Sequence, residues 1–210
     1  MRSAGRESTT LFGPIGHPYP SIRAGRDRRL LAAGAGQMRQ SERMSGEEVG
    51  TVTIRDMTPV DAATVATWRY DGPWSVYDVR DSATAVMTSE SGYFAIADAN
   101  TDALRGYICV GGEARVPGLS EEPEVLDVGI GLDPSVVGRG RGRSIVGPAL
   151  RWVEDRYGGL EMRSVVQSWN ERSLRLCHRL GFTVGGHHSV DQQGAVVKYT
   201  ILRRPAGKTP

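Results

Sequence analysis

The spacing of apolar residues changes along the chain and divides it into a long N-terminal segment and a domain. Residues 1–48 show no sustained apolar period and are rich in Gly, Ser, Pro and Arg. Such a composition is typical of a disordered extension. From Val49 onward, short β-branched or aromatic runs alternate with helical patterns, and Gly, Asp and Pro separate them. This alternation predicts an α/β domain with a mixed sheet over residues 49–204, followed by a flexible tail over 205–210.

Two kinds of apolar spacing recur in the domain. Runs rich in β-branched and aromatic residues are typical of strands, and they lie at 52–55, 93–97, 104–110, 125–132, 163–168, 182–187 and 196–202. Apolar residues three or four positions apart are typical of helices, and they lie at 59–67, 82–89, 142–157 and 171–180. In the last range Leu174, Cys177 and Leu180 share one face, and Gly181 stands where a left-handed C-cap belongs.

Length and charge narrow the class of protein. At 210 residues with 39% hydrophobic content, the chain has room for one domain of roughly 150 residues and a tail. Residues 1–45 hold eight Arg against three acids, so 18 of the 26 basic and 21 of the 24 acidic residues lie beyond them. The domain therefore has no basic excess, and a nucleic-acid partner is not favoured.

Membrane and metal partners are not expected either. No stretch approaches the roughly 18–20 consecutive apolar residues that a membrane-spanning helix requires. Cys109 and Cys177 are the two cysteines, and their spacing is unlike that of a zinc site. We therefore expect a cytoplasmic protein without a bound metal.

The most informative segment is 125–150, where a strand is followed by a glycine-rich turn and a helix. Three glycines alternate there with three arginines, namely Gly138, Arg139, Gly140, Arg141, Gly142 and Arg143. Glycine lets main-chain N–H groups approach an anion closely, and the following helix N-terminus adds a positive potential. The segment predicts a diphosphate site, and its arginines can pair with further phosphate oxygens.

Two other phosphate-binding templates do not fit this loop. A P-loop requires GxxxxGK[ST], but Gly147 is followed by Pro148 and Ala149. A dinucleotide fingerprint requires GxGxxG, but the sixth position counted from Gly138 is Arg143. The loop therefore belongs to neither class.

Gly129 and Gly131 interrupt a strand that otherwise consists mainly of Val, Ile and Leu. Glycine inside a strand weakens it unless a bulge or the close approach of another backbone requires it. We expect a bulge that frees a main-chain N–H near residues 130–132. An open strand edge there can pair with a ligand that carries peptide-like amides.

A glycine-bearing strand, an Asp-Pro step, a GxGxG turn, an amphipathic helix, a strand and the segment 170–182 follow one another in this chain. In this order they resemble the GNAT acetyltransferase superfamily, over roughly residues 50–203. Segments 68–77 and 114–118 are also similar to one poorly characterised bacterial branch of it. The resemblance implies an acyl-CoA N-acyltransferase fold, in which the central strands splay into a V that holds acetyl-CoA as co-substrate.

The resemblance also implies which residues contact acetyl-CoA. They are the backbone of Ile130, Gly131 and Leu132, the loop from Gly138 through Arg143, and Asn170. Asn170 is equally suited to cap a helix without any ligand, so both roles stay open. Val137 replaces the Gln or Arg that usually opens the family's loop, and Pro148 inside the expected helix predicts a kink or a late helix start.

Two residues are candidates for proton transfer. In many relatives a tyrosine seven residues after the asparagine is thought to protonate the leaving thiolate, and Cys177 stands at that position. Because Cys177 also lies on an apolar helix face, a buried structural role is the alternative. Asp127 is the acid nearest the glycine-bearing strand, where some relatives have a general base, and a salt bridge or solvation is its alternative. A freed main-chain N–H is the expected oxyanion donor.

The aromatic residues Trp68, Tyr70, Trp74 and Tyr77 lie where relatives bind the acceptor. Aromatic walls suit an amine or an apolar body, although core packing is the alternative role for some of them. We expect a bacterial N-acetyltransferase that moves acetyl to a primary amine of a small molecule or a protein. The alternative function is a non-catalytic acyl-CoA-binding module, and assembly into a homodimer stays open.

Overall fold

The computed structural model describes residues 51–192 and 194–207. The extension predicted over residues 1–48 lies outside the described residues, as do residues 208–210 of the predicted tail. Within the described ranges, no helix combines the length and the apolar character that a bilayer crossing needs.

Seven strands form one mixed sheet in the order β1-β2-β3-β4-β5-β7-β6. Their bounds are β1 Val52–Asp56, β2 Tyr93–Asp98, β3 Leu104–Val110, β4 Val125–Leu132, β5 Glu161–Gln167, β6 Thr183–Gln192 and β7 Ala195–Arg204. Every neighbouring pair is antiparallel except β4 and β5, which are parallel. A parallel pair needs a crossover connection, and helix α2 (Gly142–Tyr157) supplies it. The predicted mixed sheet is confirmed.

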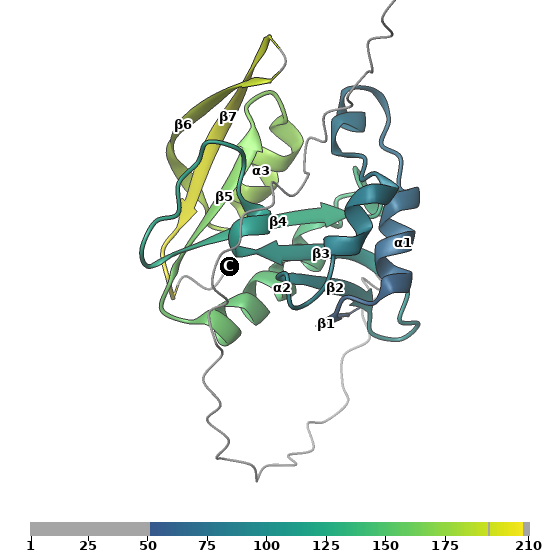
Figure 1. Cartoon of the computed structure of the whole chain (residues 1–210). Helices are drawn as coiled ribbons and strands as arrows, with labels where there is room; N and C mark the ends of the chain where they lie inside the picture. Colours follow the sequence, from purple (N-terminus) through teal and green to yellow (C-terminus); the bar gives the residue numbers. More distant parts are fainter. Residues whose placement is uncertain (1–50, 193, 208–210) are drawn as a thin grey trace, which may run out of the picture. The chain divides into compact units, whose positions relative to one another are not determined.

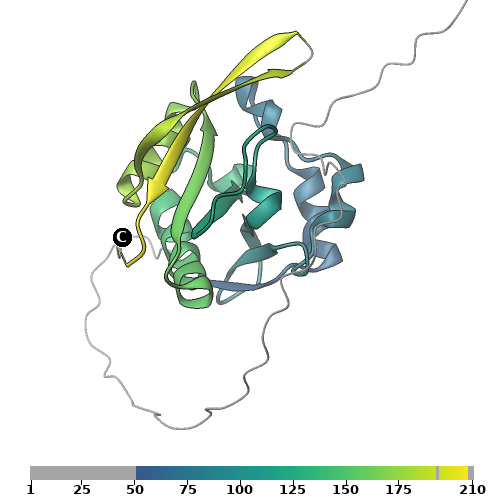
Figure 2. The same cartoon turned by 60° about the vertical axis from the view of Figure 1, so that its left-hand side comes forward.

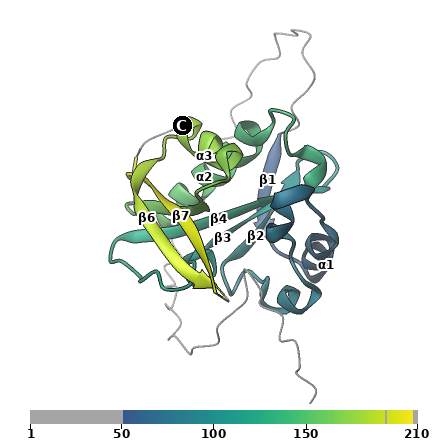
Figure 3. The ribbon, with the colours of Figure 1, turned by 90° about the horizontal axis from the view of Figure 1, so that it is seen from above.

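Helices cover both faces of the sheet (Figure 3). Helix α1 (Pro59–Thr67) packs on one face, where its Val65 joins a cluster with Tyr93 and Cys109. Helices α2 and α3 (Glu171–Arg179) pack on the other face. The sheet is therefore buried on both sides in its central part.

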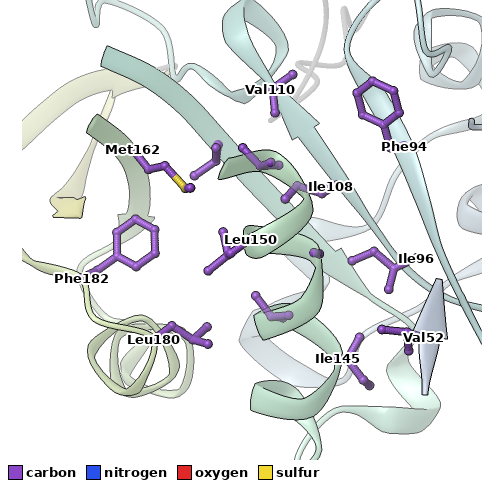
Figure 4. Packing of buried hydrophobic residues seen from close by; sticks show 14 of the residues in the cluster. Val52, Phe94, Ile96, Ile108, Val110, Ile145, Leu150, Met162, Leu180 and Phe182 are labelled. Atoms are coloured by element: carbon purple, nitrogen blue, oxygen red, sulfur yellow. The ribbon is translucent and has the colours of Figure 1, made fainter. Parts of the chain in front are cut away.

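Helix α2 provides much of the larger core cluster (Figure 4). Its Ile145 and Leu150 are at most 5% exposed and pack among residues from several strands, including Ile96, Ile108 and Met162. Burying a side chain of this size contributes roughly 1.5–3 kcal/mol relative to exposure. The apolar face of α2 therefore fixes the helix, and the loop that precedes it, against the sheet.

Local signals set the ends of the helices. Thr58 and Asp61 form a reciprocal capping box at the start of α1. Gly181 ends α3 in the left-handed region (φ 88°), and two backbone bonds close a Schellman turn there. The expected left-handed cap is confirmed. Helix α2 begins at Gly142, so Pro148 does not delay its start.

One predicted helix is absent. The segment predicted over 82–89 forms instead a 3₁₀ turn at Asp81–Val86. Ser, Thr and Asp side chains compete for backbone hydrogen bonds and lower helix propensity, so a short segment rich in them does not sustain α-helical bonding. The C-terminal strands are longer than predicted and form an extended ribbon (Figure 2).

The two parallel strands diverge after a short contact. β4 and β5 pair only through Val125–Asp127 and the three facing residues of β5. Further along, β4 stays paired with β3 while β5 stays paired with β7, so the two strands separate (Figure 1). The structure therefore contains a V with β4 and β5 as its arms.

Candidate functional site

The main-chain groups of β4 divide into two sets by residue parity. The amide of Asp133 donates to the Arg105 carbonyl (3.0 Å), so the odd-numbered residues of this strand face β3. The amide of Glu161 donates to the Glu124 carbonyl (3.1 Å), so the even-numbered residues face β5. Because β5 has diverged beyond the third residue of β4, the even-numbered groups that follow open into the V.

Two of the three predicted backbone contacts face the V. Ile130 and Leu132 present their N–H and C=O groups to it, whereas the groups of Gly131 face β3. The Leu132 carbonyl accepts a hydrogen bond from the Tyr70 hydroxyl at 2.7 Å. The edge therefore offers alternating donors and acceptors to an extended ligand with amide groups.

The glycines of β4 make room for side chains of β3. The β3–β4 register runs without a shift, so the expected bulge is absent. The N–H groups that face the V are free because β4 and β5 diverge. A Cβ at Gly129 would lie 2.8 Å from the Cys109 sulfur, and one at Gly131 would lie 2.3 Å from a ring carbon of Tyr107. The prediction of a bulge was wrong, because these strand glycines are explained by the packing of Cys109 and Tyr107 against them.

The predicted phosphate loop lies between the end of β4 and the start of α2. Gly138 and Gly140 have φ of 79° and 75°, and a Cβ at either position would meet nothing within 4 Å. These two positions need glycine for their backbone conformation and leave open space for a ligand. Arg139 and Arg143 in the loop are exposed.

The first turn of α2 offers main-chain donors next to this loop. Arg141 occupies the N-cap position, and its side chain makes no capping hydrogen bond to the following amides. A Cβ at Gly142 would lie 3.0 Å from Leu176, so the third glycine of the loop lets α3 approach. The arrangement fits an anion at the helix N-terminus.

Asn170 occupies the N-cap of α3 and is 4% exposed. Its side-chain oxygen accepts from the Ser173 amide (3.2 Å) and the Trp74 indole (3.4 Å). Its side-chain amide donates to the Tyr77 hydroxyl (3.1 Å). The capping role is therefore present, and the same side chain joins α3 to the aromatic segment near the N-terminal end of the domain.

The four aromatic residues predicted to bind the acceptor lie in two places. Tyr70 contacts the end of β4, while Trp74 and Tyr77 contact Asn170 at the end of β5. These three residues thus connect the two arms of the V at its open end. Trp68 is 7% exposed and stacks on Tyr107 (centroids 6.2 Å apart), so it belongs to the cluster beneath α1.

Trp169 extends the aromatic group at the open end. Its ring centroid lies 5.9 Å from that of Trp74 and 6.2 Å from that of Tyr77, and the residue is 41% exposed. The Arg172 guanidinium lies 4.2 Å from the Trp74 centroid. Trp169 was not among the predicted site residues, although its position directly before Asn170 was a signal.

Asp127 lies in a buried ion-pair network at the closed end of the V. It is 2% exposed and accepts from Arg163 Nε (2.6 Å) and Nη2 (3.0 Å) and from Arg115 Nε (2.9 Å). Arg163 also donates to Glu122 and to the Ser120 carbonyl. Asp127 therefore forms the salt bridge that was the alternative to a catalytic role. A role as general base stays a prediction.

Cys177 packs against the larger core cluster with Leu174 and Leu176. Burial raises the pKa of its thiol to about 12. Its role as general acid stays a prediction. Among the described residues, no group of three or more His, Cys, Asp or Glu side chains is placed to hold a metal ion.

Tyr107 was not among the predicted site residues. Its hydroxyl lies 2.8 Å from the point where a Cβ of Gly131 would stand, so the phenol lies over β4 on the α1 face of the sheet. Burial raises the pKa of this hydroxyl, and Cys109 and Tyr70 nearby add to the effect. No pattern in the sequence pointed to Tyr107, because its pairing with Gly131 depends on the register of β3 and β4.

Comparisons with known proteins agree with this fold. The GNAT acetyltransferase domain model matches residues 43–183, more than half of the chain. Among solved structures, a GNAT-family acetyltransferase from Bacillus anthracis is similar, with a TM-score of 0.61, 13% identity and coverage of 75% of this chain and 96% of that chain. No curated protein matches the sequence.

Two further solved structures share the fold. A chimera of the Vibrio cholerae spermidine N-acetyltransferase has a TM-score of 0.58 and 15% identity, covering 74% of this chain and 95% of that chain. A phosphinothricin acetyltransferase from Sinorhizobium meliloti, in complex with acetyl-CoA, has a TM-score of 0.52 and 19% identity, covering 75% of this chain and 89% of that chain. The chain belongs to the GNAT acetyltransferase family.

Proposed function

We propose that this protein transfers the acetyl group of acetyl-CoA to a primary amine of a small molecule or a peptide. The observation that carries the proposal is the position of the glycine loop at the end of β4, the arm of the V whose free main-chain groups include those of Ile130. A ligand with a diphosphate at one end and two amides in an extended arm matches both features. Acetyl-CoA has this chemistry.

In this assignment, the loop from Gly138 through Arg143 and the first turn of α2 bind the diphosphate. The main-chain groups of Ile130 and Leu132 orient the pantetheine arm. The Ile130 N–H, which faces the V, donates to the oxygen of the thioester carbonyl as negative charge develops there. The aromatic group formed by Tyr70, Trp74 and Tyr77 borders the entrance for the acceptor.

The amine that accepts the acetyl group is open to a direct assay. The similar structures include enzymes named for spermidine and for phosphinothricin, which differ in charge. A panel of spermidine, phosphinothricin, free amino acids and short peptides covers these chemistries. Release of the free thiol of CoA upon addition of an amine reports transfer.

Binding can be tested separately from transfer with two matched variants. Gly140→Glu places a carboxylate in the loop, where it blocks the amides and repels phosphate. Gly159→Glu is the control, because Gly159 also has a positive φ (85°) with open space around its Cβ position but lies at the other end of α2. Both changes carry a similar backbone strain of roughly 1–2 kcal/mol.

We expect calorimetry to show acetyl-CoA binding by the wild type and by Gly159→Glu, and none by Gly140→Glu. Equal binding by both variants would contradict the loop assignment. Binding of acetyl-CoA without CoA release for any amine in the panel would instead favour the non-catalytic acyl-CoA-binding module. Cys177 stands where relatives usually have a tyrosine that is thought to protonate the thiolate. This replacement is the reason to test the non-catalytic alternative.

A further inference from the structure

The hydroxyl of Tyr107 has no hydrogen-bond partner among the described residues. In contrast, the hydroxyls of Tyr70, Tyr77, Tyr93 and Tyr199 each take part in a hydrogen bond. A largely buried phenol without a partner is costly and calls for an explanation. Tyr107 is only partly buried, so some of the residue is accessible from outside.

The position of this hydroxyl follows from the strand register. Tyr107 of β3 pairs directly with Gly131 of β4, and its ring lies over the glycine. The neighbours of Gly131 are Ile130 and Leu132, whose main-chain groups open into the V. The phenol therefore reaches from β3 across β4, toward the edge assigned to the pantetheine arm.

The ring has little freedom to leave this position. It stacks on Trp68 with centroids 6.2 Å apart and an interplanar angle of 19°, and it packs at 5.9 Å against Tyr93. A side chain at position 131 would overlap the ring, so glycine there keeps the position available. Packing against two other aromatic rings helps a catalytic group to hold its orientation.

The other candidates for proton transfer are already engaged. The Asp127 carboxylate accepts hydrogen bonds from two guanidinium groups at the closed end of the V. The Cys177 thiol packs among apolar side chains on the α2 and α3 side of the sheet. Tyr107 lies on the opposite face, where α1 packs, and Tyr70 of the assigned acceptor entrance is close enough to affect its pKa.

We propose that the Tyr107 hydroxyl is a catalytic proton relay, which carries a proton from the attacking amine nitrogen to the departing CoA sulfur. This inference rests on the proposed acetyl transfer. It assigns to a residue of β3 the proton transfer for which the sequence offered only Cys177 and Asp127.

The step balances without any further reactant. The amine nitrogen forms a bond to the thioester carbon, and the carbonyl electron pair moves onto oxygen. When this pair returns, the C–S bond breaks and its electron pair stays on sulfur. The nitrogen gives one proton to the Tyr107 oxygen while that oxygen gives its own proton to sulfur. Tyrosine ends neutral, and one proton has moved from nitrogen to sulfur.

A relay of this kind suits a phenol that stays protonated. Burial raises the pKa of Tyr107, so the phenolate is not populated near neutral pH. Because the relay receives and releases a proton in one step, the reaction does not require the ionised form.

The test compares Tyr107→Phe with Tyr93→Phe. Both variants keep the aromatic cluster and lose one hydroxyl, but the Tyr93 hydroxyl donates to Glu113 (3.2 Å) and is not assigned to the site. The assay measures CoA release with an accepted amine from the panel, and calorimetry measures the Kd of acetyl-CoA. We expect Tyr107→Phe to lower kcat by about tenfold or more, while the Kd stays within about twofold. Tyr93→Phe should keep kcat within about threefold.

Thermal unfolding separates this role from a structural one. Because the Tyr107 hydroxyl has no partner in the part of the chain that the structure describes, its removal should leave the Tm unchanged or slightly higher. A normal kcat in Tyr107→Phe, or a weakened Kd that accounts for its loss of activity, would overturn the relay and leave acetyl transfer standing. A wild type that binds acetyl-CoA but acetylates no amine would overturn both the proposed function and the relay.

Discussion

Replacement of Asp127 by Asn distinguishes a structural carboxylate from a catalytic one. The substitution keeps the size of the side chain, but it removes the charge and places an NH₂ donor where an oxygen now accepts from a guanidinium. Asp127 and the Arg163 side chain are 2% and 0% exposed. Removing one member of a buried ion pair typically costs about 3–5 kcal/mol, since the remaining charge stays buried.

The contacts of Arg163 place the expected cost at the lower end of this range. Its guanidinium keeps Glu122 and the Ser120 carbonyl as partners after the substitution. We therefore expect Asp127→Asn to lower the free energy of unfolding by about 3 kcal/mol. In a domain of this size each kcal/mol shifts the Tm by roughly 2–4 °C, so the expected decrease is about 6–12 °C.

Urea denaturation and thermal scans measure these values, with Glu171→Gln as the control. Glu171 pairs with Arg175 four residues later, and their side chains are 76% and 62% exposed. Loss of this surface pair should change stability by less than about 0.5 kcal/mol. If Asp127→Asn is as stable as the wild type, the Asp127 carboxylate does not stabilise the fold. A large loss of kcat in such a stable variant would show that Asp127 is the general base.

Two further predictions concern titratable side chains. Burial raises the pKa of the Cys109 and Cys177 thiols to about 12. Native protein at pH 8 should therefore react with iodoacetamide at least about tenfold more slowly than unfolded protein, and Cys177→Ala should keep kcat within about threefold. A greater loss in that variant would support Cys177 as the general acid. Hydrogen bonds from Arg203, together with Arg163, lower the pKa of Glu122. The stability due to its ionised form is fully present above the ordinary glutamate pKa of about 4.3 and is lost as the pH falls through the lowered value. Chemical denaturation of Glu122→Gln should show a weaker loss of stability below about pH 4 than the wild type, and identical pH profiles would contradict this assignment.

Features specified by neighbouring residues could be predicted from the sequence. The predicted bounds of α1 and α2 agree with the structure, because the Thr58 capping box and the glycine at 142 act within one helical turn. The Gly181 cap also follows from local backbone chemistry. The glycine loop was recognisable because its amide groups and its glycines are adjacent in the chain.

Features that depend on distant residues could not be predicted in this way. Asp127 is 36 residues from Arg163, and no local pattern shows that β5 places this arginine beside it. The bulge in β4 was predicted wrongly for the same reason, because the residues that decide it lie on another strand. Glycine in a strand is consistent with either a bulge or a large side chain on the adjacent strand, and only the register decides between them.

The sequence by itself determined the order of the strands along the chain, the places of α1, α2 and α3, and the place of the glycine loop, because these depend on residue spacing and backbone conformation. Tertiary structure decided where the V opens, which groups of β4 face it, and which side chains from other strands reach it. Tyr107 shows the reason. Its position over Gly131 depends on how two strands align, and that alignment results from packing across the whole sheet.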